Sequence, residues 1–314
     1  MPDSTNRVTN RLLKADLRNG LLFAAPWLIG FICLTAYPIG TSIYYSLCSY
    51  DAVSPPHWVG AQNYSILLTE DELFWRSLWN TAYMIIFGLP LGLVGSLALA
   101  FLLNLKVRAM AFYRTLYYLP SITPIVAASA LWLWLLNPEI GLINECIKLF
   151  GVILRWAHLP APSGPGWLID PAWAKPALIF MGLWGAGGGM LIYLAGLQDV
   201  PEQLYEAADL DGASSFRKAW HITLPMLSPV IFFNLVMGLI GSFQYFTQVY
   251  VMTGGGPQDA TMFYALYLFN NAFLNFKMGY ASAMAWILFI ITLFCTLVVF
   301  KTSARWVYYP GELK

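Results

Sequence analysis

Residues 206–225 read EAADLDGASSFRKAWHITLP, a polar stretch between two long segments that hold no charged residue. Charged side chains are costly inside a bilayer, so a compact charged loop between two apolar segments belongs at a membrane surface. The pattern predicts a structured hairpin that a partner on that side of the membrane can bind. Its seven charged residues, counted from the preceding turn onward, are Asp199, Glu202, Glu206, Asp209, Asp211, Arg217 and Lys218.

The composition is typical of a protein whose solvent is largely lipid. Of 314 residues, 59% are hydrophobic and only 11% are charged, whereas soluble domains carry about 25% charged residues. Mean hydropathy is +0.61. A net charge of +1 gives no basic surface for nucleic acid, so no nucleic-acid partner is expected.

The cysteines show no CxxC spacing and lie far apart in the sequence. We expect them to be small buried hydrophobic residues rather than metal ligands or a disulfide framework. They are Cys33, Cys48, Cys146 and Cys295.

Six segments are long and apolar enough to cross a bilayer, which takes about 20 predominantly apolar residues. None of them contains Asp, Glu, Lys or Arg. The sequence therefore predicts an all-α, polytopic membrane helical bundle with six transmembrane helices, and an even number places both termini on one side. The segments are Leu21–Tyr45, Trp79–Leu105, Leu116–Leu136, Pro176–Leu197, Pro225–Met252 and Tyr280–Phe300.

Lysine and arginine set the expected orientation, because they are enriched on the cytoplasmic side of membrane proteins. Twelve of the 17 lie in the N-terminal tail, in the loops after the second and fourth segments, and in the C-terminal tail. We therefore expect both termini and the loop at 199–225 to be cytoplasmic. The five on the opposite side are Arg76, Lys148, Arg155, Lys175 and Lys277.

The first part of the polar loop predicts a short helix and its stop. Asp199 can cap this helix, with Glu202 as the partner in a capping box. The helix then runs from Glu202 to Leu210. Gly212 follows where the helix must end, and glycine tolerates the left-handed backbone conformation needed there.

The second part of the loop predicts another short helix that returns to the membrane. Ser214 or Ser215 can cap it, and it continues through Trp220. Pro225 then suits the first turn of the next span, where its missing N–H costs nothing. The expected unit is a helix, a glycine turn and a second helix.

The small pair Ala207-Ala208 allows a partner to approach closely, and Glu206 offers it a charge-assisted hydrogen bond. An ordinary solvated loop fits the composition equally well. Composition alone therefore does not distinguish a docking surface for a partner from an ordinary solvated loop.

The order Glu206-Ala207-Ala208, Gly212 and Ile222-Thr223-Leu224-Pro225 resembles the EAA loop of binding-protein-dependent ABC importer permeases. The resemblance is closest to the carbohydrate-uptake group, such as the maltose and glycerol-3-phosphate permease subunits, and it covers nearly the whole chain. Supporting stretches are Trp58-Val59-Gly60, Asn63-Tyr64, Phe74-Trp75, Asn80-Thr81, Asn137-Pro138, Gly141-Leu142-Ile143-Asn144, Tyr193-Leu194-Ala195-Gly196-Leu197 and Thr253-Gly254-Gly255-Gly256-Pro257.

The resemblance implies the ABC type I importer permease fold and a bacterial or archaeal plasma membrane. It implies four kinds of partner: a sister permease in a heterodimer, cytoplasmic ATP-binding subunits, an extracytoplasmic solute-binding protein, and a sugar-like solute. It also implies that the ATPase docks on this loop, through Glu206, Ala207, Ala208, Asp211, Gly212, Ile222, Leu224 and Pro225.

No GxxxxGK[ST] motif for nucleotide binding occurs in the chain. The sequence therefore agrees that ATP hydrolysis takes place in a separate partner subunit. Gly254-Gly255-Gly256 is followed by Pro257 and has no lysine, so it is read as a turn. We expect no cofactor and no catalytic site in this chain, with ATP used by the partner ATPase.

These inferences divide the chain into five parts. The expected parts are a cytoplasmic N-terminal tail at 1–19, a first transmembrane helix at 20–48, an extracytoplasmic loop at 49–78, a five-helix ABC importer permease domain at 79–301 that includes the coupling loop 199–225, and a cytoplasmic C-terminal tail at 302–314.

The fifth span is the richest in polar residues, which within a membrane face a cavity or another helix. Gln244 and Gln248 are four apart and are expected to share a helix face. With Asn234 and Tyr245 they supply the amides and aromatic rings that suit a sugar. Hydrogen bonding between helices explains the same residues equally well, so both readings stay open.

Span four contains Gly185-Ala186-Gly187-Gly188-Gly189, where each glycine weakens a helix by about 1 kcal/mol relative to alanine. Close packing against a sister chain or a gating kink would each explain this run. Carbohydrate-uptake permeases often place bulkier or polar residues there, so which residues of span four line the pathway stays open.

Two other function classes are weaker. An ion-coupled secondary transporter is expected to hold ionisable residues within its spans, and the six segments have none. An integral membrane enzyme needs a catalytic constellation, and the sequence offers none within a span. His57, His158 and His221 are scattered without ligand spacing, so we expect no metal site.

Overall fold

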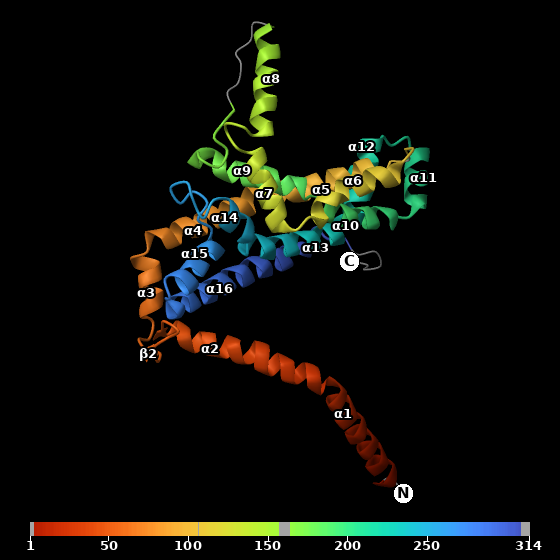
Figure 1. Ribbon diagram of the computed structural model, residues 1–314. Helices are drawn as coiled ribbons and strands as arrows, with labels where there is room; N and C mark the ends of the chain where they lie inside the picture. Colours follow the sequence, from red (N-terminus) through yellow and green to blue (C-terminus); the bar gives the residue numbers. More distant parts are fainter. Residues whose placement is uncertain (1–2, 106, 157–163, 309–314) are drawn as a thin grey trace. The chain divides into compact units, whose positions relative to one another are not determined.

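The computed structural model describes residues 3–105, 107–156 and 164–308. The chain divides into two compact units (Figure 1). One unit comprises residues 1–66 and 271–286, and the other comprises residues 67–270 and 287–314. The described chain is nearly all helical, as predicted. Its two strands, β1 (Cys48–Ser49) and β2 (His57–Trp58), form one short antiparallel pair in which Cys48 faces Trp58.

Four described helices are long and apolar enough to cross a membrane: Asp16–Ser46, Glu72–Leu103, Ser215–Phe243 and Met278–Ser303. Two further pairs of helices qualify only if each bent pair counts as one span, which gives up to six. The prediction of a polytopic helical membrane bundle is therefore confirmed. Large apolar side chains on the outer surface fit this conclusion, as Phe23 and Leu34 show with exposed fractions of 90% and 80%.

The first unit is built on a long, interrupted N-terminal helix. It consists of α1 (Asp3–Phe31), a π-helical turn η1 (Ile32–Ala36) and α2 (Tyr37–Ser46). The buried Asn63 amide, at the start of α3 (Gln62–Thr69), donates 2.9 Å hydrogen bonds to the carbonyl oxygens of Ser46 and Cys48. Trp286 of α16 (Met278–Ser303) donates its indole N–H to Ser42 Oγ at 3.1 Å.

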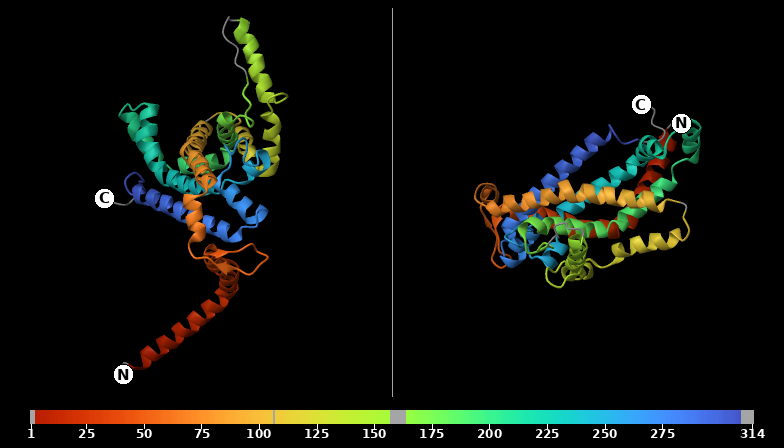
Figure 2. Two further views of the ribbon diagram at one scale, coloured as in Figure 1. Left: turned by 90° about the vertical axis from the view of Figure 1, so that its left-hand side faces the viewer. Right: turned by 90° about the horizontal axis from the view of Figure 1, so that it is seen from above.

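The second unit packs long helices side by side, as the views in Figures 1 and 2 agree. Its centre is α10 (Gly187–Gln198), which contacts α5 (Leu89–Leu103), α6 (Met110–Ile122) and α13 (Leu224–Phe243). Residue Leu197 of α10, Ala100 of α5 and Leu227 of α13 belong to one buried apolar cluster. The helix α4 (Glu72–Tyr83) continues into α5 through the π-helical turn η2 (Met84–Gly88).

A second apolar cluster lies toward the opposite end of this unit and joins shorter elements. It includes Trp132 of α7 (Ile125–Leu135), Leu178 of α9 (Pro171–Trp184) and Val249 of α14 (Thr247–Met252). Phe263, the residue before α15 (Tyr264–Phe269), and Leu266 within that helix also belong to this cluster. The turn η4 (Asn270–Leu274) follows α15.

The two segments predicted as spans three and four are bent helix pairs rather than straight helices. Helices α6 and α7 meet at 97°, where Thr123 is extended and is followed by Pro124. Proline disfavours a helical conformation at the preceding residue and has no N–H to donate, which explains the break. Helices α9 and α10 meet at 47° across Gly185 and Ala186, inside the glycine run that the sequence marked as weak.

The segment between spans three and four contains an amphipathic helix, α8 (Leu142–Trp156). Figure 1 shows α8 running across the direction of α10 and α13. At its base, Asn144 accepts a 2.8 Å hydrogen bond from the indole N–H of Trp167 and donates to the Pro138 carbonyl oxygen at 3.0 Å. These bonds fix the start of α8 against the segment that leads into α9.

The cysteine prediction is only partly correct. All four are free thiols, and Cys48 is buried as expected. Cys33 and Cys146 are exposed and Cys295 is half-buried, because their helices present those faces outward. In a membrane protein an outward face can still be an apolar environment, which hydropathy alone does not distinguish from a core position.

Candidate functional site

The hairpin begins with α11 (Glu202–Leu210), which ends in a Schellman turn. Gly212 has φ of +71°, and its N–H donates to the Asp209 carbonyl oxygen at 3.1 Å. The Ala213 N–H reaches back to the Ala208 carbonyl oxygen at 2.9 Å. This pair of bonds is the usual way to close a helix on a left-handed glycine. The predicted glycine stop is present.

The predicted N-terminal cap of α11 is wrong. Asp199 is the C-terminal capping residue of α10, and the residue before α11 is Pro201, which makes no side-chain cap. Val200 and Pro201 separate Asp199 from the first residue of α11, so Asp199 does not occupy the capping position of that helix. Glu202 does lie in the first turn of α11, where a carboxylate is favoured by the helix dipole.

The second helix of the hairpin is continuous with the next span. Ser214 caps α12 (Ser215–Lys218) by accepting a 3.4 Å hydrogen bond from the Arg217 N–H. The π-helical turn η3 (Ala219–Thr223) then joins α12 to α13, so that Ser215–Phe243 forms one helical rod. The sequence predicted a separate short helix; instead, Pro225 lies within the first turn of α13, after helical residues, and does not interrupt the rod.

Two side-chain contacts tie α11 to this rod. The Lys218 ammonium pairs with the Asp209 carboxylate at 2.7 Å. The hydroxyl groups of Tyr205 and Thr223 share a 2.9 Å hydrogen bond, and Thr223 is buried. The two helices of the hairpin are therefore joined by two separate side-chain contacts.

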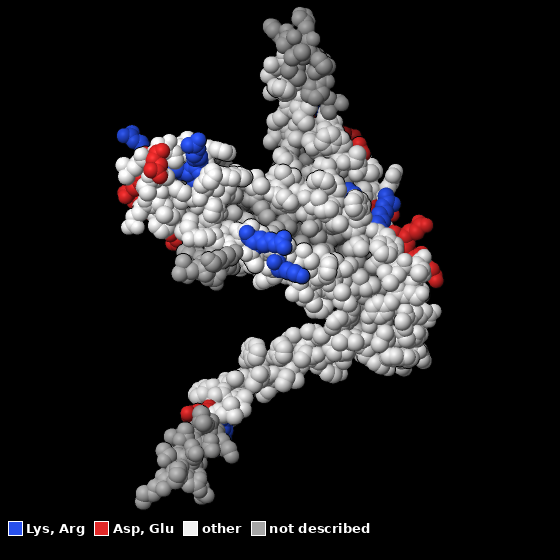
Figure 3. Space-filling model, turned by 180° about the vertical axis from the view of Figure 1, so that it is seen from behind, with Lys and Arg blue, Asp and Glu red and all other residues white. Residues whose placement is uncertain are grey.

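Four of the eight predicted contact residues are exposed on this hairpin. Glu206, Ala207, Asp211 and Gly212 are exposed, and Ala208 is half-buried. Ile222, Leu224 and Pro225 are half-buried at the base of α13. Figure 3 shows acidic and basic side chains gathered at the end of the unit formed by α11 and α12.

Sequence reasoning missed three large apolar residues on the same hairpin. Leu210 is 90% exposed and Phe216 is 77% exposed. Trp220 is also exposed, and its ring stacks on that of Phe216 with centroids 6.3 Å apart. Exposed aromatic residues of this kind anchor protein interfaces. The signal in the sequence was their presence in a charged loop too short to bury them.

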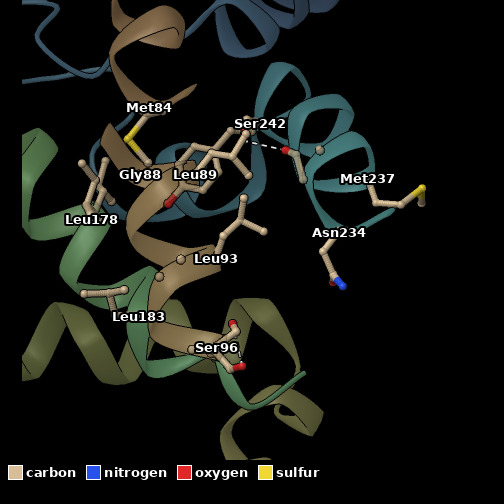
Figure 4. Close-up of a pocket in the computed structure, with 18 of the residues that line it drawn as sticks. Met84, Gly88, Leu89, Leu93, Ser96, Leu178, Leu183, Asn234, Met237 and Ser242 are labelled. Atoms are coloured by element: carbon tan, nitrogen blue, oxygen red, sulfur yellow. Dashed lines mark hydrogen bonds between the residues drawn. The ribbon is translucent and has the colours of Figure 1, made fainter. Parts of the chain in front are cut away.

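A cavity of about 370 Å³ lies between α5, the α9–α10 pair and α13. Much of its wall is apolar or glycine, with Met84, Leu89, Leu93 and Leu183 among the lining residues. Figure 4 shows Ser96 on α5 and Asn234 and Ser242 on α13, in walls contributed by different helices. The polar residues that line it are Ser96, Tyr193, Asn234, Ser242 and Tyr245.

The cavity includes only two of the four predicted pathway residues. Asn234 and Tyr245 line it, whereas Gln244 and Gln248 are not among its lining residues. The expectation that the two glutamines share a helix face is wrong, because α13 ends at Phe243 and α14 starts at Thr247. The break rotates the two side chains out of the four-residue register.

The glycine run allows helices within this chain to approach closely. A Cβ atom on Gly187 would overlap the backbone carbonyl oxygen of Tyr117 on α6. One on Gly189 would lie 2.9 Å from Ser96 Oγ, which itself donates to the Ala186 carbonyl oxygen at 2.9 Å. The bend and the close packing therefore occur together, and the packing is against α5 and α6 of the same chain.

A buried asparagine organises the end of this unit that lies away from the hairpin. Asn80 is 2% exposed, and its amide nitrogen donates to the carbonyl oxygens of Asp259 and Met262 at 2.9 and 3.0 Å. These acceptors follow the TGGGP stretch, where Gly254 and Gly255 have positive φ and form the predicted turn. The Asn80 amide oxygen accepts a 2.9 Å hydrogen bond from Lys175 Nζ.

No group of three or more potential metal ligands occurs in the part of the chain that the structure describes. His57 lies in β2 and His221 in η3, and His158 falls outside the described residues. The described histidines therefore lie in separate elements.

Comparisons with known proteins give one consistent result. A family described as "binding-protein-dependent transport system inner membrane component" matches residues 78–307. The chain is 41% identical over 306 residues to the probable ABC transporter permease protein YesP of Bacillus subtilis (strain 168), covering 96% of each chain. It is 32% identical to the sulfoquinovosyl glycerol transport system permease protein SmoG of Agrobacterium fabrum (strain C58 / ATCC 33970), covering 94% of this chain and 93% of the relative.

The fold is similar to a solved transporter. A chain in the crystal structure of a bacterial ABC transporter involved in the import of the acidic polysaccharide alginate superposes with a TM-score of 0.77. The two chains are 25% identical, and the match covers 94% of this chain and 99% of the other.

Proposed function

This chain belongs to the family of binding-protein-dependent transport system inner membrane components, and we propose that it moves a sugar or sugar derivative through the cavity bounded by α5, α9–α10 and α13. It is a multi-pass permease subunit of the plasma membrane. The relatives named for sulfoquinovosyl glycerol and for alginate transport carbohydrates, which supports a carbohydrate solute. A solute-binding protein, a sister permease and ATP-binding subunits are its proposed partners.

The observation that carries the proposal is the rod Ser215–Phe243. Its first turn belongs to the exposed hairpin, and Asn234 and Ser242 further along it line the cavity. A partner that binds the hairpin therefore acts on a helix that forms the cavity wall. We propose that residues 199–225 dock on a separate ATPase and that ATP is hydrolysed there, not in this chain.

Charge and shape on the hairpin support this docking role. Glu206 is exposed beside Ala207, so a partner can approach the α11 backbone and pair with the carboxylate. Leu210 and Phe216 add apolar anchors that stay largely exposed within the described chain. The combination of a polar rim with large exposed apolar residues is typical of a protein interface.

The polar groups and apolar walls of the cavity suit an uncharged solute that forms hydrogen bonds and has flat apolar faces. Asn234 lines the cavity, and its amide nitrogen donates to the Val230 carbonyl oxygen at 2.9 Å, so its amide oxygen remains an acceptor. Ser242 lies two helical turns further along α13 and donates to the Gly238 carbonyl oxygen at 2.8 Å. Between them, Gly238 allows the Leu89 side chain to pack against α13, whereas a Cβ atom on Gly241 would meet no atom within 4 Å.

The test reverses the charge on the hairpin or breaks its turn. Glu206→Lys and Gly212→Pro are expected to abolish solute-stimulated ATP hydrolysis by the reconstituted complex while membrane insertion stays normal. Proline cannot adopt a φ of +71° and removes the N–H that bonds to Asp209. Glu139→Lys, an exposed charge reversal in the segment before α8, is the matched control and should couple normally.

Normal coupling in both hairpin variants would contradict the docking role. Uptake that survives deletion of the ATPase but collapses with the proton gradient would instead identify an ion-coupled secondary transporter. The two outcomes are separable because the first concerns ATP turnover and the second concerns the source of energy.

A further inference from the structure

Helix α8 (Leu142–Trp156) has a charged face and an apolar face, and the apolar face stays largely exposed within the described chain. On the charged face, Glu145 and Lys148 form an ion pair at 2.7 Å, and both side chains are more than half exposed. The other face carries large apolar side chains spaced three, four and seven apart, which is the spacing of one helix face. Those with exposed fractions between 52% and 67% are Leu142, Leu149, Phe150 and Ile153.

The helix is too short to cross a bilayer, and it does not run in the direction of the spans. It has 15 residues, whereas a span takes about 20. Its axis lies across α10 and α13 (Figures 1 and 2). It precedes α9 in the chain, and the start of α9 is the end of the α9–α10 pair opposite to α11. A helix that crosses the spans near their ends lies along the membrane surface, here on the side away from the hairpin.

A groove of about 660 Å³ lies between α8 and the start of α9. Cys146 and Phe150 are among the α8 residues that line it, and Trp167 and Trp173 line its other side. The two tryptophan rings meet edge to face, with centroids 5.4 Å apart. None of the described residues that line the groove is charged. A groove of this kind suits an apolar chain better than a polar solute.

The groove is continuous with the outer surface of a membrane helix. Trp173 and Phe180 are seven residues apart on α9, so they share a helix face, and they are 43% and 49% exposed. The α9–α10 pair is apolar enough to form one span. In a multi-pass membrane protein, the outer faces of such helices contact lipid wherever no partner chain covers them. Tryptophan is enriched at the level of the lipid headgroups, which fits the Trp167–Trp173 pair at the start of α9.

We propose that α8 is an interfacial helix, and that its apolar face and groove bind the acyl chains of phospholipids in the membrane leaflet away from the hairpin. Amphipathic helices that lie on a membrane bury their apolar face about 5–10 Å into the boundary between headgroups and acyl chains. Glu145 and Lys148 then face water and the headgroups. Since these two charges pair with each other, binding does not require anionic lipid. The proposal concerns lipid and goes beyond the proposed function.

The test places an environment-sensitive fluorophore on one cysteine at a time. The sample is the complete transporter, with its sister permease and ATPase, in nanodiscs of phosphatidylethanolamine and phosphatidylglycerol. In a Cys33→Ala, Cys295→Ala background, Cys146 is the thiol that reacts, because it is exposed whereas Cys48 is fully buried. Quenching is measured with a phospholipid that carries a nitroxide on its acyl chain and, separately, with iodide in the water.

Two further probes are made in the same background with Cys146→Ala. Leu149→Cys reports on the apolar face at a position that does not line the groove. Lys148→Cys is the matched control, since it lies between the two other probes in sequence but on the charged face.

We expect the lipid nitroxide to quench the probes at 146 and 149 at least about threefold more than the probe at 148, because the two faces of an interfacial helix lie at different depths. Iodide should quench in the reverse order. The emission of the probes at 146 and 149 should also be shifted to the blue relative to that at 148.

Two results would overturn the proposal. If iodide quenches all three probes alike and the lipid nitroxide shows no preference, the apolar face lies in water. If the probes at 146 and 149 are protected from both quenchers, a protein partner covers this face. Should the label at 146 prevent assembly, the comparison of 149 with 148 decides alone. Because no solute is present, neither result bears on the proposed transport of a sugar.

Discussion

Substituting alanine at two glycines of the bent span four should have opposite effects on stability. A Cβ atom added to Gly187 would overlap the Tyr117 carbonyl oxygen on α6, and it would also lie 3.1 Å from the Tyr118 Cα. Both are backbone atoms, so no side-chain rotation can relieve the contact. A Cβ atom added to Gly182, one turn before the bend on α9, would meet no atom within 4 Å.

The size of the difference can be estimated from these contacts. Gly182→Ala should stabilise the helix by up to about 1 kcal/mol through helix propensity. Gly187→Ala forces α10 away from α6, and overpacking of this kind costs about 1–3 kcal/mol. The two variants should therefore differ by about 1–4 kcal/mol. For a chain of this size that corresponds to a gap in melting temperature on the order of 2–6 °C.

Thermal unfolding of the purified complex in detergent or nanodiscs measures this gap. We expect the melting temperature to fall in Gly187→Ala and to stay equal or rise in Gly182→Ala. Equal melting temperatures in the two variants would refute the reasoning. They would mean that α6 and α10 do not approach as closely as described, and that the glycine run serves a kink or a contact with another chain.

Two further predictions concern single polar groups. Thr81→Val removes the hydroxyl that accepts a 2.9 Å hydrogen bond from the first N–H of α15, so it should destabilise the complex by about 1–3 kcal/mol in thermal unfolding; Thr115→Val, at an exposed site where the hydroxyl bonds only within its helix, should be close to neutral, and equal effects would count against the role of the bond. Asn234→Ala should change the maximal uptake rate more than Gln244→Ala or Gln248→Ala, because only Asn234 lines the cavity; a larger effect of either glutamine would extend the pathway to α14.

Local sequence patterns were sufficient for several elements of this protein. Uncharged segments of more than 20 residues predict membrane helices because, in lipid, a helix satisfies its backbone hydrogen bonds within a single segment of that length. The stop at Gly212 follows from the conformation that only glycine adopts without strain, and the structure gives it a φ of +71°. The exposed charges of 206–211 follow from the cost of burying them.

Patterns of this kind failed where distant segments decide the outcome. Hydropathy predicts one continuous span over residues 225–252. In the structure α13 ends at Phe243 and a new helix, α14, begins at Thr247, so Gln244 and Gln248 do not lie in the same helix. The residues Asp199 and Glu202 match a capping-box pattern, but Asp199 is the C-terminal capping residue of α10 and does not cap α11. A short motif indicates which local conformations are allowed. The packing of neighbouring helices then determines which of these conformations the chain adopts.

The sequence by itself determined the class of the protein, because composition and apolar segments respond to the solvent and need no partner within the fold. Only the tertiary structure brought Asn80 to carbonyl oxygens 179 and 182 residues away, and placed Lys175 on that amide. It also formed the cavity from α5, the α9–α10 pair and α13, and the helical rod Ser215–Phe243 joins the hairpin to the wall of this cavity. Contacts between residues so far apart depend on how helices pack, and no local spacing encodes them.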